Sequence, residues 1–257
     1  MPANPVKRTL RAGGVSLGTM VFEFDCTGLG RLMATAGAEF VVFDMEHTGW
    51  TLETLRMLVA TTRPAGVVPM VRVPAVQYHF LARALDIGAM GLMVPMVESA
   101  EQARLMVQSA KYPPAGRRGA AFAVAHDDYA AGDLVETMRS ANEEGLLSAQ
   151  IETAVGLENV EEIAAVDGID VLWVGQFDLT NFLGIPGQFN HPRLKGALER
   201  VVRVARQHGK TAAILVMSVD EGRAMLAQGF RCVAYGGDLW LYQQALRQGI
   251  SALRAPC

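Results

Sequence analysis

Acidic and basic side chains directly follow several short apolar runs of this 257-residue chain. The segment VVFDMEHTGW carries Asp44, Glu46 and His47, and VPMVRVP carries Arg72. A carboxylate beside a histidine can fix one tautomer of the ring, so His47 could move protons near neutral pH; the alternative is an ordinary loop histidine. A guanidinium at a strand end suits a carboxylate or a developing oxyanion. The alternative for Arg72 is an internal salt bridge to Asp44 or Glu46.

Two further carboxylates follow apolar runs later in the chain. Glu152 ends the segment LLSAQIE, and Asp178 lies in VGQFDLT. Two carboxylates that converge on one point can hold a divalent ion such as Mg²⁺ or Mn²⁺ that keeps several waters. Acidic residues at strand-to-helix junctions also cap helices, and this alternative is open for Asp178 but fits Glu152, which follows an apolar strand, less well.

Several other chemistries lack the residues they require. No lysine ends a predicted strand, so a Schiff-base lysine is disfavoured. The chain has neither a GxSxG serine elbow nor a phosphate-binding P-loop, and the GxG of TGLGRL lacks the third glycine of a dinucleotide site. We therefore expect no nucleotide cofactor. The four lysines are Lys7, Lys111, Lys195 and Lys210.

The elements that must position these side chains alternate between β-rich runs and helical stretches. We expect eight strands, at 15–20, 39–44, 67–72, 91–96, 146–152, 168–175, 211–216 and 231–236. Helical spacing covers 51–62, 78–87, 100–110, 155–165, 192–208, 219–228 and 239–253. This rhythm predicts one (β/α)8 TIM barrel over residues 1–257, with its polar residues at the carboxyl ends of the strands. The interval 111–145 is longer, and we expect it to be a loop over the active face.

The composition of the chain excludes some classes of binding partner. The net charge is -3 with no basic block, which argues against nucleic acid as a partner. No apolar run reaches about 18 residues and the first residues lack a signal-peptide core, so we expect no membrane segment and a cytoplasmic location. The three cysteines, Cys26, Cys232 and Cys257, are expected to be reduced thiols without a metal role.

Six motifs, in order, resemble the HpcH/HpaI aldolase family of metal-dependent class II pyruvate aldolases. This family includes 4-hydroxy-2-oxoheptanedioate and 2-dehydro-3-deoxy-sugar-acid aldolases. The motifs are FDMEHT, VRVP, LDIGAMGLMVPMVESAEQA, KYPPAGRRG, QIET and GQFDLTNFLGIPGQFNHP, and they span almost the whole chain. Many members have Gly-Pro-x-Asp-Leu where this chain has GQFDL at 175–179, and AAFAVAHDDY also departs from the family pattern. Both differences bear on substrate range.

The resemblance implies a role for each polar residue. Glu152 and Asp178 would be the ligands of Mg²⁺, Mn²⁺ or Co²⁺. Arg72 would bind the pyruvate oxygens, and His47 would be the acid/base residue with Asp44 as its support. Substrate contacts are expected from Gln150, Gly175, Gln176 and Phe177.

The resemblance also implies an oligomer. Asp86, in ALDIGA, is similar to an aspartate that reaches the active site of a neighbouring subunit. Family members form hexamers by exchanging a terminal helix, which would here be residues 239–253. We therefore expect a homo-oligomer, either a hexamer arranged as a trimer of dimers or a trimer.

Together these features predict an aldolase that reversibly cleaves 4-hydroxy-2-oxo acids to pyruvate and an aldehyde through a metal-stabilised enolate. A base assembled around His47 would take the 4-hydroxyl proton while Arg72 offsets charge on the enolate oxygen. The alternatives are other reactions on the same site, namely oxaloacetate decarboxylation, acyl-CoA cleavage or Claisen condensation. A further alternative is a non-catalytic barrel that binds 2-oxo acids. Breakdown of aromatic compounds and of sugar acids are both compatible pathways.

Overall fold

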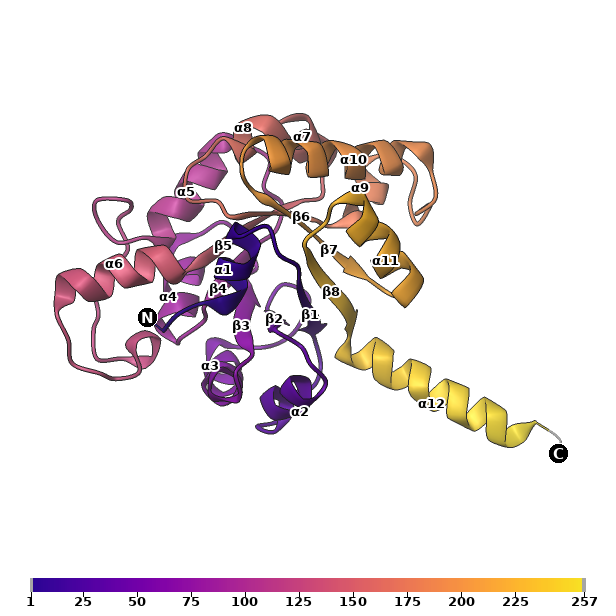
Figure 1. The fold of residues 1–257 in the computed structure, drawn as a ribbon, viewed down its shortest axis with the longest axis horizontal. Helices are drawn as coiled ribbons and strands as arrows, with labels where there is room; N and C mark the ends of the chain where they lie inside the picture. Colours follow the sequence, from indigo (N-terminus) through magenta and orange to yellow (C-terminus); the bar gives the residue numbers. More distant parts are fainter. Residues whose placement is uncertain (1, 256–257) are drawn as a thin grey trace.

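A computed structural model describes residues 2–255, and eight parallel strands form its closed central barrel (Figure 1). Neighbours in the chain are also neighbours in the barrel, and β8 pairs with β1 to close it. The strands are β1 (Ser16–Val21), β2 (Phe40–Asp44), β3 (Val68–Arg72), β4 (Gly91–Val94), β5 (Leu146–Ile151), β6 (Val171–Val174), β7 (Thr211–Val216) and β8 (Cys232–Gly237). The predicted (β/α)8 fold is confirmed.

Helices follow the strands and, with one exception at the C-terminus, cover the outside of the barrel. They are α2 (Leu29–Thr35), α3 (Leu52–Thr62), α4 (Tyr78–Asp86), α5 (Ala100–Ala110), α7 (Ala154–Glu158), α8 (Val160–Ala164), α9 (Gln176–Phe182), α10 (Pro192–Gln207) and α11 (Val219–Gln228). The stretch predicted as one helix over 155–165 is two short helices that meet at Asn159, whose side-chain amide donates to the carbonyl of Glu98 at 2.8 Å.

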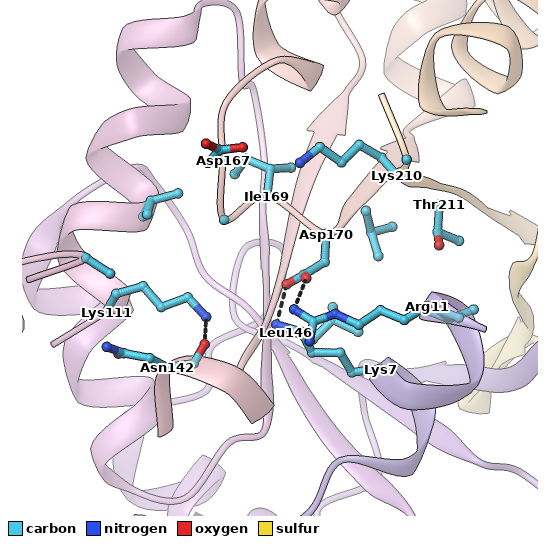
Figure 2. A pocket seen from close by; sticks show the side chains of 16 residues that line it. Lys7, Arg11, Lys111, Asn142, Leu146, Asp167, Ile169, Asp170, Lys210 and Thr211 are labelled. Carbon is cyan, nitrogen blue, oxygen red and sulfur yellow. Dashed lines mark hydrogen bonds and ion pairs between the residues drawn. The ribbon is translucent and has the colours of Figure 1, made fainter. Parts of the chain in front are cut away.

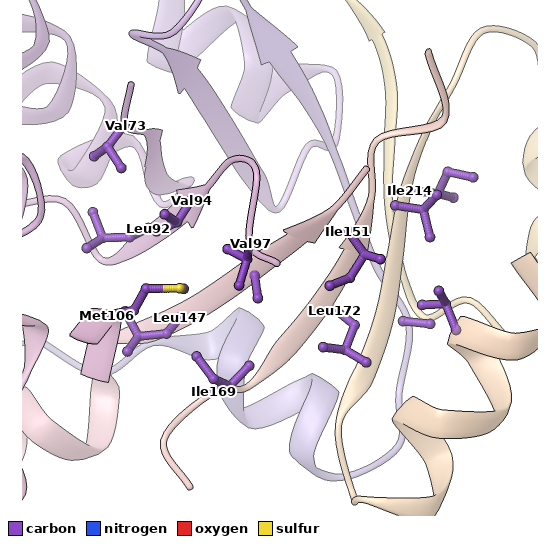
Figure 3. Close-up of a cluster of buried hydrophobic side chains, with 14 of the residues drawn as sticks. Val73, Leu92, Val94, Val97, Met106, Leu147, Ile151, Ile169, Leu172 and Ile214 are labelled. Carbon is purple, nitrogen blue, oxygen red and sulfur yellow. The ribbon is translucent and has the colours of Figure 1, made fainter. Parts of the chain in front are cut away.

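The period-2 alternation of the strands decides which side chains face the barrel axis. Val41 and Phe43 of β2 pack outward against the helices, whereas Phe40 and Val42 belong to the separate cluster inside the barrel. The next inward position of β2 is Asp44. Figure 3 shows part of the outward layer, where Val94, Ile151 and Leu172 gather with their neighbours.

The same alternation places the inward polar residues of the other strands. Met70 faces the interior of β3, so Arg72 is the next inward residue, and it pairs in register with Asp44. Leu146 faces the interior of β5, which directs Gln150 and then Glu152 inward at the carboxyl end. The barrel thus collects these side chains at the end where active sites of this fold lie.

The opposite end of the barrel is closed by a short helix, α1 (Pro5–Arg11). Its first turn is capped by Asn4, whose side chain accepts a hydrogen bond from the Lys7 amide at 3.0 Å. Val6 and Leu10 pack into the interior cluster of the barrel. The amino-terminal segment is therefore a plug at the N-terminal ends of the strands.

The segment 111–145 contradicts one expectation. It follows α5 and leads through η2 (Ala125–Asp127) and α6 (Leu134–Glu144) into β5, so it is a helix-to-strand connection at the N-terminal end. None of its residues lines the cavity at the other end of the barrel. The expectation of a loop over the active face of its own chain is wrong because α5 ends at Ala110, so the chain has already returned to the bottom when the insertion begins.

The last helix, α12 (Asp238–Arg254), extends away from the barrel (Figure 1). None of its residues is buried, although Leu246 and Ile250 are large and apolar. Cys26 is exposed and Cys232 buried, and both are free thiols; Cys257 lies outside the described residues. Across residues 2–255 no helix combines the length and the apolarity that a membrane span requires.

Candidate active site

A cavity of about 750 Å³ opens at the carboxyl ends of the strands. Seven residues predicted from sequence line it, and they come from four different strand ends: His47, Arg72, Gln150, Gly175, Gln176, Phe177 and Asp178. A cavity of this volume can enclose a small organic substrate.

Arg72 and Asp44 form a buried ion pair at the bottom of the site. Arg72 Nε donates to Asp44 Oδ1 at 2.5 Å, and Arg72 Nη1 lies 3.2 Å from Glu46 Oε2. Asp44 is fully buried, so the ion pair is strengthened by the low local dielectric. The internal salt bridge considered for Arg72 is present, yet the guanidinium also lines the cavity. The salt bridge therefore holds Arg72 in a fixed position beside whatever the cavity binds.

Asp44 also organises the loop that carries His47. Its carboxylate accepts hydrogen bonds from the backbone amides of Glu46 at 3.2 Å and His47 at 2.9 Å. The carboxylate near the imidazole is that of Glu46, whose Oε2 is 3.7 Å from His47 Nε2. The His47 side chain is 57% exposed. Asp44 thus supports the backbone of His47, while the carboxylate of Glu46 lies beside its ring without a hydrogen bond to it.

Glu152 is a buried carboxylate held by two amides. Oε1 accepts from the Met96 amide at 2.7 Å, and Oε2 accepts from the side-chain amide of Gln150. Met96 has φ 53°, a left-handed conformation that is unusual for a side chain of this size and that aims its N–H at Glu152. Burial, helped by the negative charges of Glu46 and Asp178, raises the pKa of Glu152 to about 7.

Neither predicted metal ligand caps a helix by a side-chain hydrogen bond. The residue that caps α7 is Thr153, whose hydroxyl accepts from the Gly156 amide at 2.9 Å. Asp178 lies in the first turn of α9, and the N-cap there is Gly175, which offers no side chain. The capping alternative therefore accounts for neither Glu152 nor Asp178.

The residues present fit a divalent ion. Asp178 raises the pKa of both Glu152 and Glu46, which means that their negative charges act on one another and that a cation would relieve the repulsion. The Oε1 atom of Gln150 is buried and has no hydrogen-bond partner among the described residues. Within 2–255 no three His, Cys, Asp or Glu side chains form a ready-made cluster, so water or substrate oxygens would complete the coordination.

Aromatic residues that the sequence analysis did not single out form one wall of the cavity. Phe22 packs on Trp240 with ring centroids 4.9 Å apart, and its ring lies 5.8 Å from the Arg72 guanidinium carbon. Trp50 and Trp173 also line the cavity. Phe22 follows the end of β1 and Trp240 the end of β8, so the strand-end rule applied to the other strands would have found them.

The remaining predicted contacts are placed as follows. Gln176 is anchored by its side-chain amide, which donates to the carbonyl of Leu215 on β7 at 2.6 Å. Phe177 is exposed and packs edge-on against Phe189, with ring centroids 5.1 Å apart. Gln176 therefore belongs to the rigid wall of the cavity and Phe177 to its rim.

Asp86 is not in the site of its own chain. It ends α4 at the N-terminal side of the barrel, where its carboxylate pairs with Arg118 Nη2 at 2.6 Å. Its side chain is partly exposed, so it is available to contact a neighbouring molecule. Its role in the site of another subunit stays a prediction.

A closed barrel with an arginine, a histidine and acidic residues at the carboxyl ends of its strands has the arrangement of an enzyme of this fold, and comparison with known proteins identifies its family. Residues 29–245 match the model of the HpcH/HpaI aldolase/citrate lyase family. The chain belongs to this family.

Individual relatives cover nearly the whole chain. The 2-keto-3-deoxy-L-rhamnonate aldolase of Escherichia coli (strain K12) is 34% identical over 255 residues, which are 98% of this chain and 94% of the relative. The solved structure of an HpcH/HpaI aldolase from Desulfitobacterium hafniense DCB-2 is 33% identical, with a TM-score of 0.93 and 97% of each chain covered. Citrate synthase SbnG is 28% identical, with a TM-score of 0.86 and 96% of each chain covered. The chain is thus an aldolase-family lyase by descent.

Proposed function

We propose that the protein is a divalent-metal-dependent aldolase that reversibly cleaves 4-hydroxy-2-oxo acids to pyruvate and an aldehyde. The observation that carries the proposal is the convergence of Arg72, His47 and Asp178 on one cavity, with Glu152 buried behind the lining residue Gln150, whose side-chain amide donates to it. The similarity to an aldolase over 98% of the chain supports the same reaction class.

The chain offers a group for each requirement of the reaction. Glu152 and Asp178 would hold Mg²⁺, Mn²⁺ or Co²⁺, which when bound supplies Lewis-acid polarisation of the 2-keto group. Arg72 would donate hydrogen bonds to the oxygens of the 2-oxo acid and stabilise the charge that grows on the enolate oxygen.

Proton transfer would fall to His47, whose Nε2 lies 3.7 Å from the carboxylate of Glu46. In cleavage, the 4-hydroxyl loses its proton and the C3–C4 bond breaks to give the aldehyde. The electron pair of the broken C3–C4 bond stays with C3 and forms the enolate of pyruvate. Protonation of that enolate at C3 then yields pyruvate, and the reverse sequence joins pyruvate to the aldehyde. The exposure of His47 leaves a route for the proton to reach solvent.

We propose a 2-keto-3-deoxy sugar acid as the substrate class. The relative from Escherichia coli is named for such a compound. The cavity has room beyond a pyruvate unit, and Phe22, Trp50 and Trp240 give it an aromatic wall. This wall favours an aldehyde portion with an apolar end, because polar groups there would lose hydrogen bonds to water.

The test is release of pyruvate from 4-hydroxy-2-oxo acids of increasing chain length by chelated enzyme, before and after addition of each metal. We expect activity only with metal, and Glu152→Ala to abolish it. Pyruvate release that is equal without metal would refute the mechanism. No release from any substrate would instead favour decarboxylation, acyl-CoA cleavage or a non-catalytic 2-oxo-acid-binding role.

The similarity to citrate synthase SbnG favours a second candidate, condensation of the same enolate with an acceptor other than a simple aldehyde. Arg72, Glu152 and Asp178 would serve an enolate in either reaction. The two candidates differ in the acceptor, so trapping of the enolate by aldehydes or by oxo acids separates them.

We further propose that the protein acts as a homo-oligomer, a hexamer or a trimer, through exchange of α12, and that it resides in the cytoplasm. Tyr242, Leu246 and Ile250 recur every four residues on α12 and are exposed in the single chain. An apolar groove lies on the outside of β1 and β8 beside α2, where Leu17 and Leu32 are exposed. A partner's α12 would cover this groove and bury its own stripe. The free cysteines suit a reducing compartment.

A further inference from the structure

A second cavity, of about 540 Å³, lies at the N-terminal ends of the strands, away from the proposed active site, and Figure 2 shows the side chains that line it. Its walls come from α1, the end of α5, and the segments that lead into β5, β6 and β7. Its charged lining residues are Lys7, Arg11, Lys111, Lys210, Asp167 and Asp170. The lining therefore carries an excess of two positive charges, although the whole chain has a net charge of -3.

Two of the ammonium groups converge deep in this cavity. Lys7 Nζ donates to the Gly145 carbonyl at 2.5 Å and Lys111 Nζ donates to the same oxygen at 3.1 Å. The side chains are almost fully buried, with 2% of Lys7 and 5% of Lys111 exposed. Two like charges are thus held beside one neutral acceptor.

The carboxylate hydrogen-bonded to Lys7 of this pair is that of Asp170, and it is already engaged; Glu144 acts on Lys7 only at longer range. Asp170 accepts from Lys7 Nζ at 2.8 Å and from the Leu147 amide at 3.0 Å, and its other oxygen lies 3.5 Å from Arg11 Nη2. Within residues 2–255, Lys111 forms no salt bridge; its second acceptor is the carbonyl of Asn142. Because an ammonium has three donors, Lys7 and Lys111 each keep one N–H for a further acceptor.

Charges buried in this way are costly unless a counter-charge is near. The cost is visible in Lys111, because burial first and the neighbouring Lys7 second lower its pKa to about 7. Burial also lowers the pKa of Lys7, although Asp170 opposes this shift. An anion in the cavity would supply the missing negative charge and accept the unused N–H groups.

We propose that this cavity binds a phosphate group, either inorganic phosphate or the phosphate of a small monoester. A phosphate group carries two negative charges on one centre. These charges match the excess positive charge of the cavity lining and the closely spaced ammonium groups of Lys7 and Lys111. Lysine serves phosphate as a point charge, and Arg11, which is 61% exposed at the rim, can turn from its long contact with Asp170 toward the ligand. Leu10, Val107 and Ile169 leave an apolar side for a short organic group.

The site is independent of the aldolase proposal. Its ligand would connect the plug helix α1 with the connections before β5, β6 and β7, so occupancy would stabilise the closed end of the barrel. A purely structural ion cluster would show no ligand dependence, and this difference makes the proposal testable.

The experiment titrates the full chain at pH 6.5, below the pKa of Lys111, with inorganic phosphate, glycerol 3-phosphate and succinate by calorimetry, at constant ionic strength set with chloride. The test variants are Lys111→Met and Arg11→Ala; the second is at the surface and keeps the fold, as circular dichroism would verify. Arg8→Ala is the matched control, since Arg8 is on the same helix but outside the cavity. Arg72→Lys controls for binding in the active site.

We expect one phosphate site per chain and a rise of about 4 °C in Tm at saturating phosphate. Both test variants should weaken binding at least about tenfold, whereas the two controls should not. Tighter binding of glycerol 3-phosphate than of phosphate identifies a monoester as the ligand, and the reverse identifies the free ion. The absence of saturable binding, binding unchanged in both test variants, or equal binding of succinate would overturn the proposal.

Discussion

Gly175 leaves no room for a side chain beside Glu152. A Cβ at position 175 would lie 2.4 Å from Glu152 Oε2 and 2.8 Å from the side-chain amide nitrogen of Gln150. The φ of Gly175 is −90°, which any residue can adopt, so its role is steric. The residue after β6 therefore has no side chain, and the carboxylate of Glu152, which follows β5, occupies the space.

Gly175→Ala should displace Glu152 and lower kcat/KM by about 100-fold, because a carboxylate moved by about 1 Å no longer sits in productive geometry. The apparent affinity for Mg²⁺ or Mn²⁺ should fall in parallel. The matched control is Gly196→Ala on α10, where an added Cβ meets nothing within 4 Å. Equal activities of the two variants would show that Glu152 does not depend on this space.

Arg72→Met should damage both stability and activity. Asp44 is fully buried and would lose its cationic partner, so the free energy of unfolding should fall by about 3 kcal/mol. Activity should fall at least about 100-fold with the loss of the donor to the enolate oxygen. Chemical denaturation and initial rates measure the two effects separately.

The double variant Arg72→Met with Asp44→Asn separates the two roles. It removes the buried charge together with its partner, so most of the lost stability should return while activity stays low. A double variant that recovers activity would show that Arg72 serves only to neutralise Asp44.

The barrel could be predicted from the sequence because the order of strands and helices and the positions of the polar residues at the strand ends indicate the same fold. Alternating β-rich and helical runs specify the order of the elements, and parallel strands must direct Arg72 and Glu152 to the same end. The two helices within 155–165 were not separable, since Val160 and Ile163 continue the helical spacing past the break at Asn159.

Other features depend on contacts that no local pattern encodes. The strained amide of Met96 on Glu152 links β4 to β5, and the position of Glu46 beside both Arg72 and His47 depends on how one loop folds. The length of the segment 111–145 suggests a loop over the active face, whereas its position after α5 assigns it to the other end of the barrel.

Glu152 should make the metal-free protein less stable as the pH rises from 5 to 7. Its pKa in the folded state is about 7, above the ordinary value of 4.5, so the folded state holds the proton longer than the unfolded chain does. The contribution of Glu152 to the free energy of unfolding is fully present below pH 4.5 and is lost as the pH rises through 7. Its full size is about 3 kcal/mol. Urea denaturation in a chelator across this window measures it.

The control for this prediction is Glu152→Gln, which should flatten the decline between pH 5 and 7. Above that window Lys111 acts in the opposite sense, since its pKa is lowered to about 7 and its burial penalty is relieved as it loses its proton. Added Mg²⁺ should raise the Tm of the wild-type chain more at pH 8 than at pH 5.5. A pH dependence that is identical in Glu152→Gln would refute the assignment.

Asp238→Asn should loosen the aromatic wall of the cavity. The Asp238 carboxylate accepts from the amides of Phe22 at 2.9 Å, Glu23 at 2.9 Å and Phe24 at 2.7 Å, and so fixes the loop that carries Phe22. We expect KM for the 4-hydroxy-2-oxo acid to rise about tenfold with a smaller change in kcat. Glu199→Gln, at an exposed position on α10, is the control, and an unchanged KM in Asp238→Asn would exclude this positioning role.

Charged substitutions on the apolar stripe of α12 should disperse the proposed oligomer. Leu246→Asp combined with Ile250→Asp places two charges where a partner would bury them, so light scattering after size exclusion should give a smaller species with unchanged circular dichroism. Gln244→Asp combined with Gln248→Asp adds the same charge to the other face of the helix and should leave the assembly intact. If Asp86 completes a neighbouring site, activity should fall with the first pair alone. A wild-type chain that is already monomeric, or a first pair that assembles like the second, would show that this stripe is not an interface.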